Sequence, residues 1–128
     1  MKKNIMKKWV KALRSGEYLQ GTGYLAQEDN IGNYRFCCLG VLCNIMQEEK
    51  GGVRITDYAF NFFGKKVYSY DGDDSVLKDK VKKWSGIKNG VGKFKYKNNR
   101  TGFLANLNDR GKTFKQIADI IEKNYEAL

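Results

Sequence analysis

Three cysteines lie within eight residues of this sequence, in the stretch FCCLGVLC at residues 36–43. Cysteine can ligate zinc or attack a substrate as a thiolate. A closed zinc site needs four ligands, and the chain has no other cysteine and no histidine. A nucleophilic thiolate also needs a base, and histidine is the usual one. We therefore expect Cys38 and Cys43 to pack on the buried face of a helix, with Cys37 the most exposed of the three.

Other stretches that resemble catalytic motifs are incomplete. Asp71, Asp73 and Asp74 in YDGDD could bind a divalent ion, but the run lacks the length and the terminal glutamate of a calcium loop. Such a run is more typical of a turn and a helix cap. The glycines of GTG and NGVG match neither a Walker loop nor a dinucleotide fingerprint. The sequence therefore predicts a protein that is not an enzyme and that needs no metal and no cofactor.

The stretch NLNDRGKTF, residues 106–114, is the main candidate for a ligand site. It precedes a predicted helix, whose N-terminus has unpaired N–H groups and the positive end of the dipole and therefore suits a phosphate. Basic side chains add positive charge, and the amide and carboxylate groups could recognise a ribose or the edge of a base. The candidate ligand-binding residues in and near this stretch are Asn106, Asn108, Asp109, Arg110, Lys112, Thr113 and Arg100.

A tight turn between two helices would explain the same stretch without a ligand. Asparagine and aspartate cap such turns, and Gly111 would supply a positive φ. Asn108 and Asp109 fit this structural interpretation better, whereas both interpretations stay open for Arg110 and Lys112.

A second candidate is the basic and aromatic stretch KFKYKNNR at residues 93–100. Phe94 and Tyr96 could stack on nucleobases while the lysines contact phosphates. The alternative is an edge strand that its lysines protect from aggregation. Tyr24, Tyr34 and Arg35, on a predicted hairpin, could also line a pocket.

The net charge of +10 is concentrated in two segments. Residues 1–16 hold six bases and no acid, and residues 78–100 hold nine bases and one acid. This distribution indicates an anionic partner, either a nucleic acid or a phosphorylated small molecule. The alternative is that the charge only keeps the protein soluble.

The hydrophobic pattern predicts an α+β fold with several helices packed on a short antiparallel hairpin or sheet. Helices are expected over residues 4–15 and 38–47, from residue 74 or 75 to about 86, and after a capping box of Thr113 and Gln116. Residues 23–26 and 33–36 are expected to pair as a hairpin. The stretch TDYAFNFFG, residues 56–64, fits either a short helix or a strand.

The length of 128 residues predicts one domain, residues 1–128. No stretch approaches the roughly 20 apolar residues of a membrane span, and the charged start lacks the apolar core of a signal peptide. We therefore expect a cytoplasmic protein with reduced cysteines and no contact with a membrane.

The blocks WVKALRSGEYLQGTGYL (9–25), FCCLGVLC (36–43) and LANLNDRGKTFKQIADIIE (104–122) resemble a family of small proteins encoded by bacteriophages. In size and charge the chain also resembles phage anti-defence sponges. Those proteins bind nucleotide immune signals, such as the cyclic ADP-ribose isomers of Thoeris systems or the cyclic oligonucleotides of CBASS systems. They are small, oligomeric and non-catalytic. The resemblance implies a homodimer that acts in the cytoplasm of an infected cell.

These observations predict a protein that binds and sequesters a phosphorylated nucleotide signal without cleaving it. Two alternatives remain open at this point. The protein could be a nucleic-acid-binding accessory protein, with the basic segments following the phosphate backbone. It could also be an inhibitor that binds an acidic host protein.

Overall fold

Helix α1, Lys3–Arg14, forms because its apolar residues recur at intervals of three and four and make one continuous face. That face is buried and consists of Ile5, Met6, Trp9, Val10 and Leu13. The indole N–H of Trp9 donates a hydrogen bond of 2.8 Å to the carbonyl oxygen of Cys38. This bond ties α1 to the next helix. The predicted N-terminal helix is confirmed.

The computed structural model describes residues 1–53, 55–60 and 66–128, and the side chains of 57–60 are not part of that description. Within these ranges a five-stranded sheet has the order β1-β3-β2-β5-β4. The pairing of β1 with β3 is parallel, and the other pairings are antiparallel. The strands are β1 Leu19–Gln20, β2 Ala26–Glu28, β3 Tyr34–Phe36, β4 Ile55–Phe60 and β5 Lys66–Tyr70.

The predicted hairpin exists, with its first strand two to three residues further along the chain than expected. Strands β2 and β3 pair antiparallel, Ala26 opposite Phe36. The carboxylate of Asp29 closes the turn between them by accepting hydrogen bonds from the N–H groups of Ile31 and Asn33. The undecided stretch 56–64 begins as strand β4, and its residues 61–64 lie outside the described residues.

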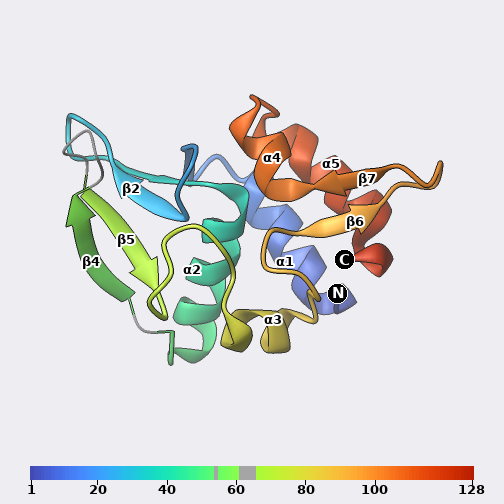
Figure 1. The fold of residues 1–128 in the computed structure, drawn as a ribbon, viewed down its shortest axis with the longest axis horizontal. Coiled ribbons are helices and arrows are strands. Elements are labelled where there is room, and N and C mark those ends of the chain that lie inside the picture. Colours follow the sequence, from blue (N-terminus) through green and yellow to red (C-terminus); the bar gives the residue numbers. More distant parts are fainter. Residues whose placement is uncertain (54, 61–65) are drawn as a thin grey trace.

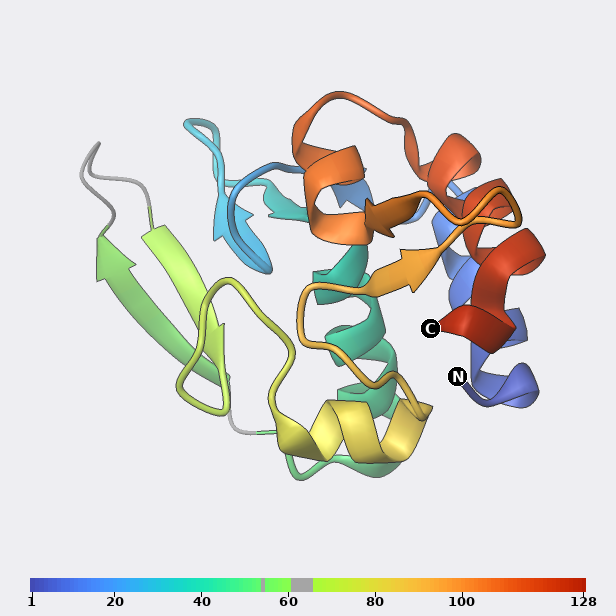
Figure 2. The ribbon, with the colours of Figure 1, turned by 45° about the vertical axis from the view of Figure 1, so that its right-hand side comes forward.

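Helix α2, Cys38–Lys50, runs through the middle of the molecule, between the sheet and the helices α1 and α5 (Figures 1 and 2). Its start packs directly on the backbone before β2, because Gly40 has no side chain to separate them. A Cβ atom at Gly40 would lie 1.7 Å from the carbonyl oxygen of Leu25. The helix ends at Gly51, whose φ is +66°. The prediction of a buried helix that stops at this glycine is confirmed.

Helix α3, Asp79–Ser85, starts later than predicted. The expected caps, Asp74 and Ser75, lie instead in a turn whose N–H groups at Ser75 and Val76 donate to the carboxylate of Asp73, and the N-cap of α3 is Lys78. The predicted start at residue 74 or 75 is therefore wrong, whereas the predicted end is confirmed. Gly86 ends α3 in the left-handed region, with φ +79°.

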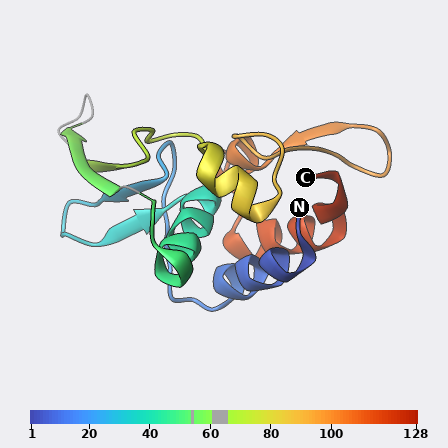
Figure 3. The same cartoon turned by 90° about the horizontal axis from the view of Figure 1, so that it is seen from below.

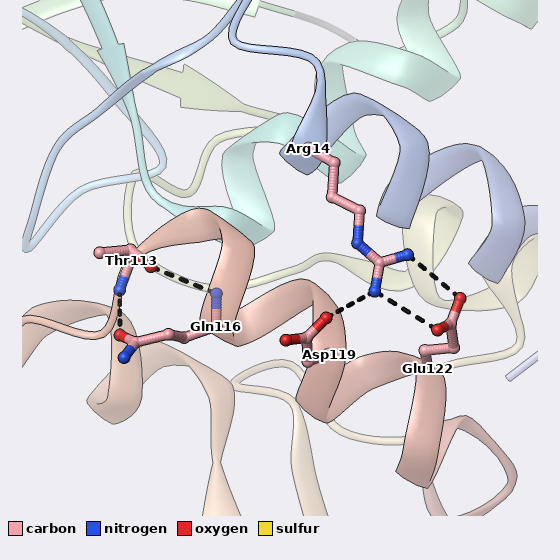
Figure 4. Close-up of polar contacts among 5 residues, drawn as sticks. All are labelled: Arg14, Thr113, Gln116, Asp119 and Glu122. Atoms are coloured by element: carbon pink, nitrogen blue, oxygen red, sulfur yellow. Dashed lines mark hydrogen bonds and ion pairs between the residues drawn. The ribbon is translucent and has the colours of Figure 1, made fainter.

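The C-terminal third forms a hairpin and two helices. Its elements are β6 Lys93–Lys95, β7 Thr101–Phe103, α4 Leu104–Asp109, α5 Phe114–Asn124 and the 3-10 helix η1 Tyr125–Ala127. Helix α5 lies along α1 (Figure 3). Arg14 of α1 binds Asp119 and Glu122 of α5 across this contact, at 2.6 and 3.2 Å (Figure 4). The predicted α+β fold is confirmed, and among the described residues no helix is long and apolar enough to cross a membrane.

Candidate functional site

Asn108, a predicted ligand-binding residue, is completely buried and holds three segments of the chain together. Its Oδ1 atom accepts hydrogen bonds from the side chain of Gln20 at 2.9 Å and from the N–H of Cys38 at 3.1 Å. Its Nδ2 atom donates to the carbonyl oxygen of Gly21 at 2.8 Å and to Asp109 at 3.3 Å. The amide therefore has no polar atom left for a ligand, and its role is structural.

The stretch 106–114 contains the end of α4, the turn at residues 110–113 and the first residue of α5. The carboxylate of Asp109 accepts a hydrogen bond of 3.0 Å from the N–H of Gly23, and the carbonyl oxygen of Lys112 accepts one of 2.8 Å from Gln20. Gly111 has a φ of +99°, as the structural interpretation predicted. The exposed side chains here are those of Asn106, Asp109, Arg110, Lys112 and Thr113. Asn108, Asp109 and Gly111 therefore serve the fold, whereas ligand binding by Arg110 and Lys112 stays a prediction.

Thr113 is the N-cap of α5, and the predicted capping box is confirmed (Figure 4). Its hydroxyl accepts a hydrogen bond of 3.2 Å from the N–H of Gln116, whose side-chain oxygen accepts one of 3.0 Å from the N–H of Thr113.

We expect Thr113→Ala to lower the free energy of unfolding by about 1 kcal/mol, because the first turn of α5 loses its cap. Thr113→Ser keeps the hydroxyl and should retain most of the stability. Urea denaturation of both variants measures the difference. Equal stability of the alanine and serine variants would show that the cap contributes nothing.

All three cysteines are buried and unpaired. Cys37 is the most exposed of the three, as expected, but at 5% it is still buried, because it is the N-cap of α2 and its sulfur accepts a hydrogen bond of 3.4 Å from the N–H of Gly40. Burial raises the pKa of the Cys37 thiol to about 11, and it also raises the pKa of Cys38 and of Cys43. The prediction that Cys38 and Cys43 pack in the core is confirmed.

We expect a thiol reagent such as DTNB to label none of the cysteines in the folded protein at pH 8, because the thiols are buried and protonated. After denaturation in guanidinium chloride it should label all three. The absorbance of the released thionitrobenzoate measures the number of labelled cysteines. Rapid labelling of one thiol in the folded protein would contradict the burial of these side chains.

The second predicted stretch, 93–100, forms strand β6 and the turn of the hairpin β6–β7, which lies on the opposite side of α4 from the sheet (Figure 1). Phe94 is only 2% exposed and packs against Tyr96, with ring centroids 4.7 Å apart. The expectation that both rings stack on bases is therefore wrong for Phe94. Tyr96 is half-buried and lines a hollow of about 320 Å³, together with Lys97, Asn98, Lys123 and Asn124. Arg100 is exposed on the same hairpin but does not line this hollow.

The hairpin candidates Tyr24 and Arg35 lie apart from Tyr96, on the side of the sheet. The guanidinium of Arg35 binds the carboxylate of Asp29 at 2.9 Å and donates to the carbonyl oxygen of Gln20 at 3.3 Å. Tyr24 is half-buried in the segment that Asp109 holds at Gly23. The predicted site residues therefore fall into two separate groups, and the structure does not bring them together in one pocket.

The two basic segments meet at a hollow that no single stretch of sequence indicated. The backbone N–H of Lys2, at the start of α1, donates a hydrogen bond of 2.9 Å to the carbonyl oxygen of Ser85 at the end of α3. A hollow of about 340 Å³ lies beside this contact. We call it the lysine pocket. It is lined by Lys2, Met46, Lys50, Lys80, Lys83 and Trp84.

The lysine pocket combines four cations with an apolar floor. Lys50 and Lys83 lie in the last turns of α2 and α3, where a positive charge interacts favourably with the helix dipole. Their ammonium groups form no hydrogen bond and no ion pair within the described part of the chain. Lys80 donates to the carbonyl oxygen of Gly52 at 2.9 Å and forms an ion pair of 3.9 Å with the carboxylate of Asp71. Met46 and Trp84, 9% and 8% exposed, form the floor.

Among the described residues, the lining of the lysine pocket includes no carboxylate and no thiol. No cluster of metal-ligating side chains is found in the described ranges either. The concentration of positive charge suits an anion with several negative groups. The apolar floor offers a surface for the flat or apolar part of the same ligand.

A family model described as "Domain of unknown function (DUF8296)" matches residues 1–125 of the chain. No curated protein and no solved structure matches the chain significantly.

Proposed function

The chain belongs to the DUF8296 family, and we propose that it binds a phosphorylated nucleotide in the lysine pocket and holds it without cleaving it. The observation that carries this proposal is the convergence of Lys2, Lys50, Lys80 and Lys83 on one hollow. These lysines come from α2, α3 and the residue that precedes α1. Like charges placed together repel each other unless an anion neutralises them, so the arrangement favours binding of a multiply charged anion.

The pocket offers two kinds of contact, one for the phosphate groups of a ligand and one for its base or ribose. The ammonium groups of Lys50 and Lys83 are free to contact phosphate oxygens as charge-assisted donors. The N-terminus of α1 adds positive potential, because it has no side-chain cap and no acid in its first turn. A base or a ribose would pack against the small parts of Trp84 and Met46 that line the hollow.

A site of lysines and apolar side chains is suited to sequestration, that is, to binding a ligand without cleaving it. The lining residues supply cations and apolar contacts, and both favour the binding of an anionic ligand. A protein that holds a nucleotide signal lowers its free concentration. This agrees with the resemblance of the chain to phage anti-defence sponges.

A second candidate function, nucleic-acid binding, is favoured by the outward face of α1. Lys3, Lys7 and Lys11 follow one another at intervals of four residues along this face. None of the three forms an ion pair among the described residues, whereas Lys8 binds Glu49 and Arg14 binds α5. Such a row of cations can follow a phosphate backbone, and its affinity would fall steeply with salt.

A thermal-shift panel separates these functions. It should contain ADP-ribose, isomers of cyclic ADP-ribose, cyclic di- and trinucleotides and short oligonucleotides. We expect one small nucleotide to stabilise the protein, by about 2.7 kcal/mol at a hundred times its Kd. Denaturing the complex should release that nucleotide intact. Shifts with oligonucleotides alone would favour nucleic-acid binding, and the absence of any shift would contradict both functions.

A further inference from the structure

A third hollow, of about 410 Å³, lies between the α1–β1 connection, strand β3 and helix α2. We call it the acidic groove. It is lined by Glu17, Tyr18, Leu19, Asn33, Tyr34, Phe36, Asn44 and Glu48. The chain has 24 lysines and arginines, yet this lining includes two carboxylates and neither a lysine nor an arginine. The groove therefore has the opposite charge to the rest of the protein.

The polar atoms of the acidic groove are mostly acceptors. The side-chain amide of Asn44 donates one hydrogen bond of 2.8 Å to the hydroxyl of Tyr18 and one of 3.1 Å to the carboxylate of Glu48. Both of its N–H groups are thus used, and its oxygen is left as an acceptor. In the part of the chain that the structure describes, neither Glu17 nor Glu48 forms an ion pair. The acceptors of the groove are therefore suited to a positively charged hydrogen-bond donor.

Aromatic and apolar side chains form the walls of the groove. The rings of Tyr18 and Phe36 stand perpendicular to each other, with an interplanar angle of 86° and centroids 5.2 Å apart. Tyr34 and Leu19 are 55% and 43% exposed, which is high for residues of this type. Aromatic faces attract cations, and the apolar walls fit the methylene groups of an alkyl chain.

The negative potential of the groove reaches its aromatic wall. The pKa of Tyr18 is raised, mainly because the phenol is partly buried, and the charges of Glu48 and Glu17 raise it further. The hydrogen bond from Asn44 acts in the opposite direction. Both carboxylates therefore affect the same phenol, although Glu17 lies between α1 and β1 and Glu48 lies in α2.

We propose that the acidic groove binds the primary ammonium group of an aliphatic amine. The ammonium group, with three N–H donors, lies between the carboxylates of Glu17 and Glu48 and the amide oxygen of Asn44. The methylene chain lies against Leu19 and Phe36. This ligand is carried either by a free polyamine or by a lysine side chain of another protein. The site is distinct from the lysine pocket, which takes ligands of the opposite charge.

Isothermal titration calorimetry with two probes tests this site, spermidine for a free polyamine and Nα-acetyl-lysine N-methylamide for a protein lysine. We expect at least one probe to bind, and the tighter of the two identifies the source of the amine. The double variant Glu17→Gln/Glu48→Gln should weaken this binding by about tenfold or more, because it removes charged hydrogen-bond acceptors. Both glutamates are exposed, so the variant should fold normally.

The matched control is Asp79→Asn/Glu126→Gln, which changes the net charge equally on α3 and η1, outside the groove. It should bind the probe as the wild type does. Equal losses in both double variants would mean that the amine responds only to the overall charge, and would overturn the proposal. So would the failure of both probes to bind, or binding of 1-pentanol as tight as that of the amines.

Discussion

Replacing Gly40 with alanine is expected to lower the free energy of unfolding by about 3 kcal/mol or more, or to prevent folding altogether. The new Cβ atom would lie 1.7 Å from the carbonyl oxygen and 2.6 Å from the carbonyl carbon of Leu25. Neither atom can move aside easily. The N–H of Leu25 is bonded to the carbonyl oxygen of Asp74 at 2.7 Å, and its own carbonyl oxygen accepts from Cys37 at 3.2 Å.

The matched control for this substitution is Gly32→Ala. Gly32 has a φ of +84°, and a Cβ atom added there would have no neighbouring atom within 4 Å. Alanine there costs only the strain of a left-handed residue, about 1–2 kcal/mol. Urea denaturation followed by circular dichroism compares the two variants. A Gly40→Ala protein as stable as the Gly32→Ala protein would contradict the close packing of α2 on the backbone of Leu25.

Asn108→Ala is expected to lower the free energy of unfolding by about 3–5 kcal/mol, since each buried group left without a hydrogen bond costs about 1–3 kcal/mol. The groups left without a partner are the N–H of Cys38 and the carbonyl oxygen of Gly21. Asn108→Asp should also be strongly destabilising, because it replaces a donor with a buried negative charge beside Asp109.

Asn106→Ala is the control for the Asn108 variants, because Asn106 lies on the same short helix, α4, but is exposed. Its effect should be within about 0.5 kcal/mol. Chemical denaturation of the three variants measures all of these changes. If Asn108→Ala were as stable as Asn106→Ala, Asn108 would not hold α4, the segment 20–21 and the start of α2 together, and a ligand-binding role would have to be reconsidered.

The parts of the fold that could be predicted depend on neighbours in sequence. The buried face of α1, the capping box of α5 and the end of α2 at Gly51 each follow from residues within one or two helical turns. The start of α3 was predicted wrongly because an aspartate that caps a helix and one that closes a turn look alike in sequence. Asp74 and Ser75 were expected to cap α3, but they lie in a turn that the hydrogen bonds of Asp73 organise.

The candidate sites depend on contacts that are distant in sequence. Asn108 looked available for a ligand because its partners, at residues 20, 21 and 38, are far away along the chain. The charge pattern indicated two basic segments, but whether they touch depends on how α1 and α3 pack. Lys50, which completes the lysine pocket, lies in neither basic segment. No pattern of neighbouring residues in the sequence indicates that these lysines lie together.

The most direct test of nucleotide binding in the lysine pocket is the affinity of the double variant Lys50→Glu/Lys83→Glu. Isothermal titration at constant ionic strength would use ADP-ribose and a cyclic dinucleotide, with Lys93→Glu/Lys95→Glu as the control. The control changes the net charge equally, on the exposed sides of β6 and outside the pocket.

We expect the wild type and the control to bind the same nucleotide with similar affinity. The pocket variant should bind it about tenfold more weakly or worse, because it loses charged hydrogen bonds to phosphate. Equal affinity in the two double variants would contradict binding in the lysine pocket.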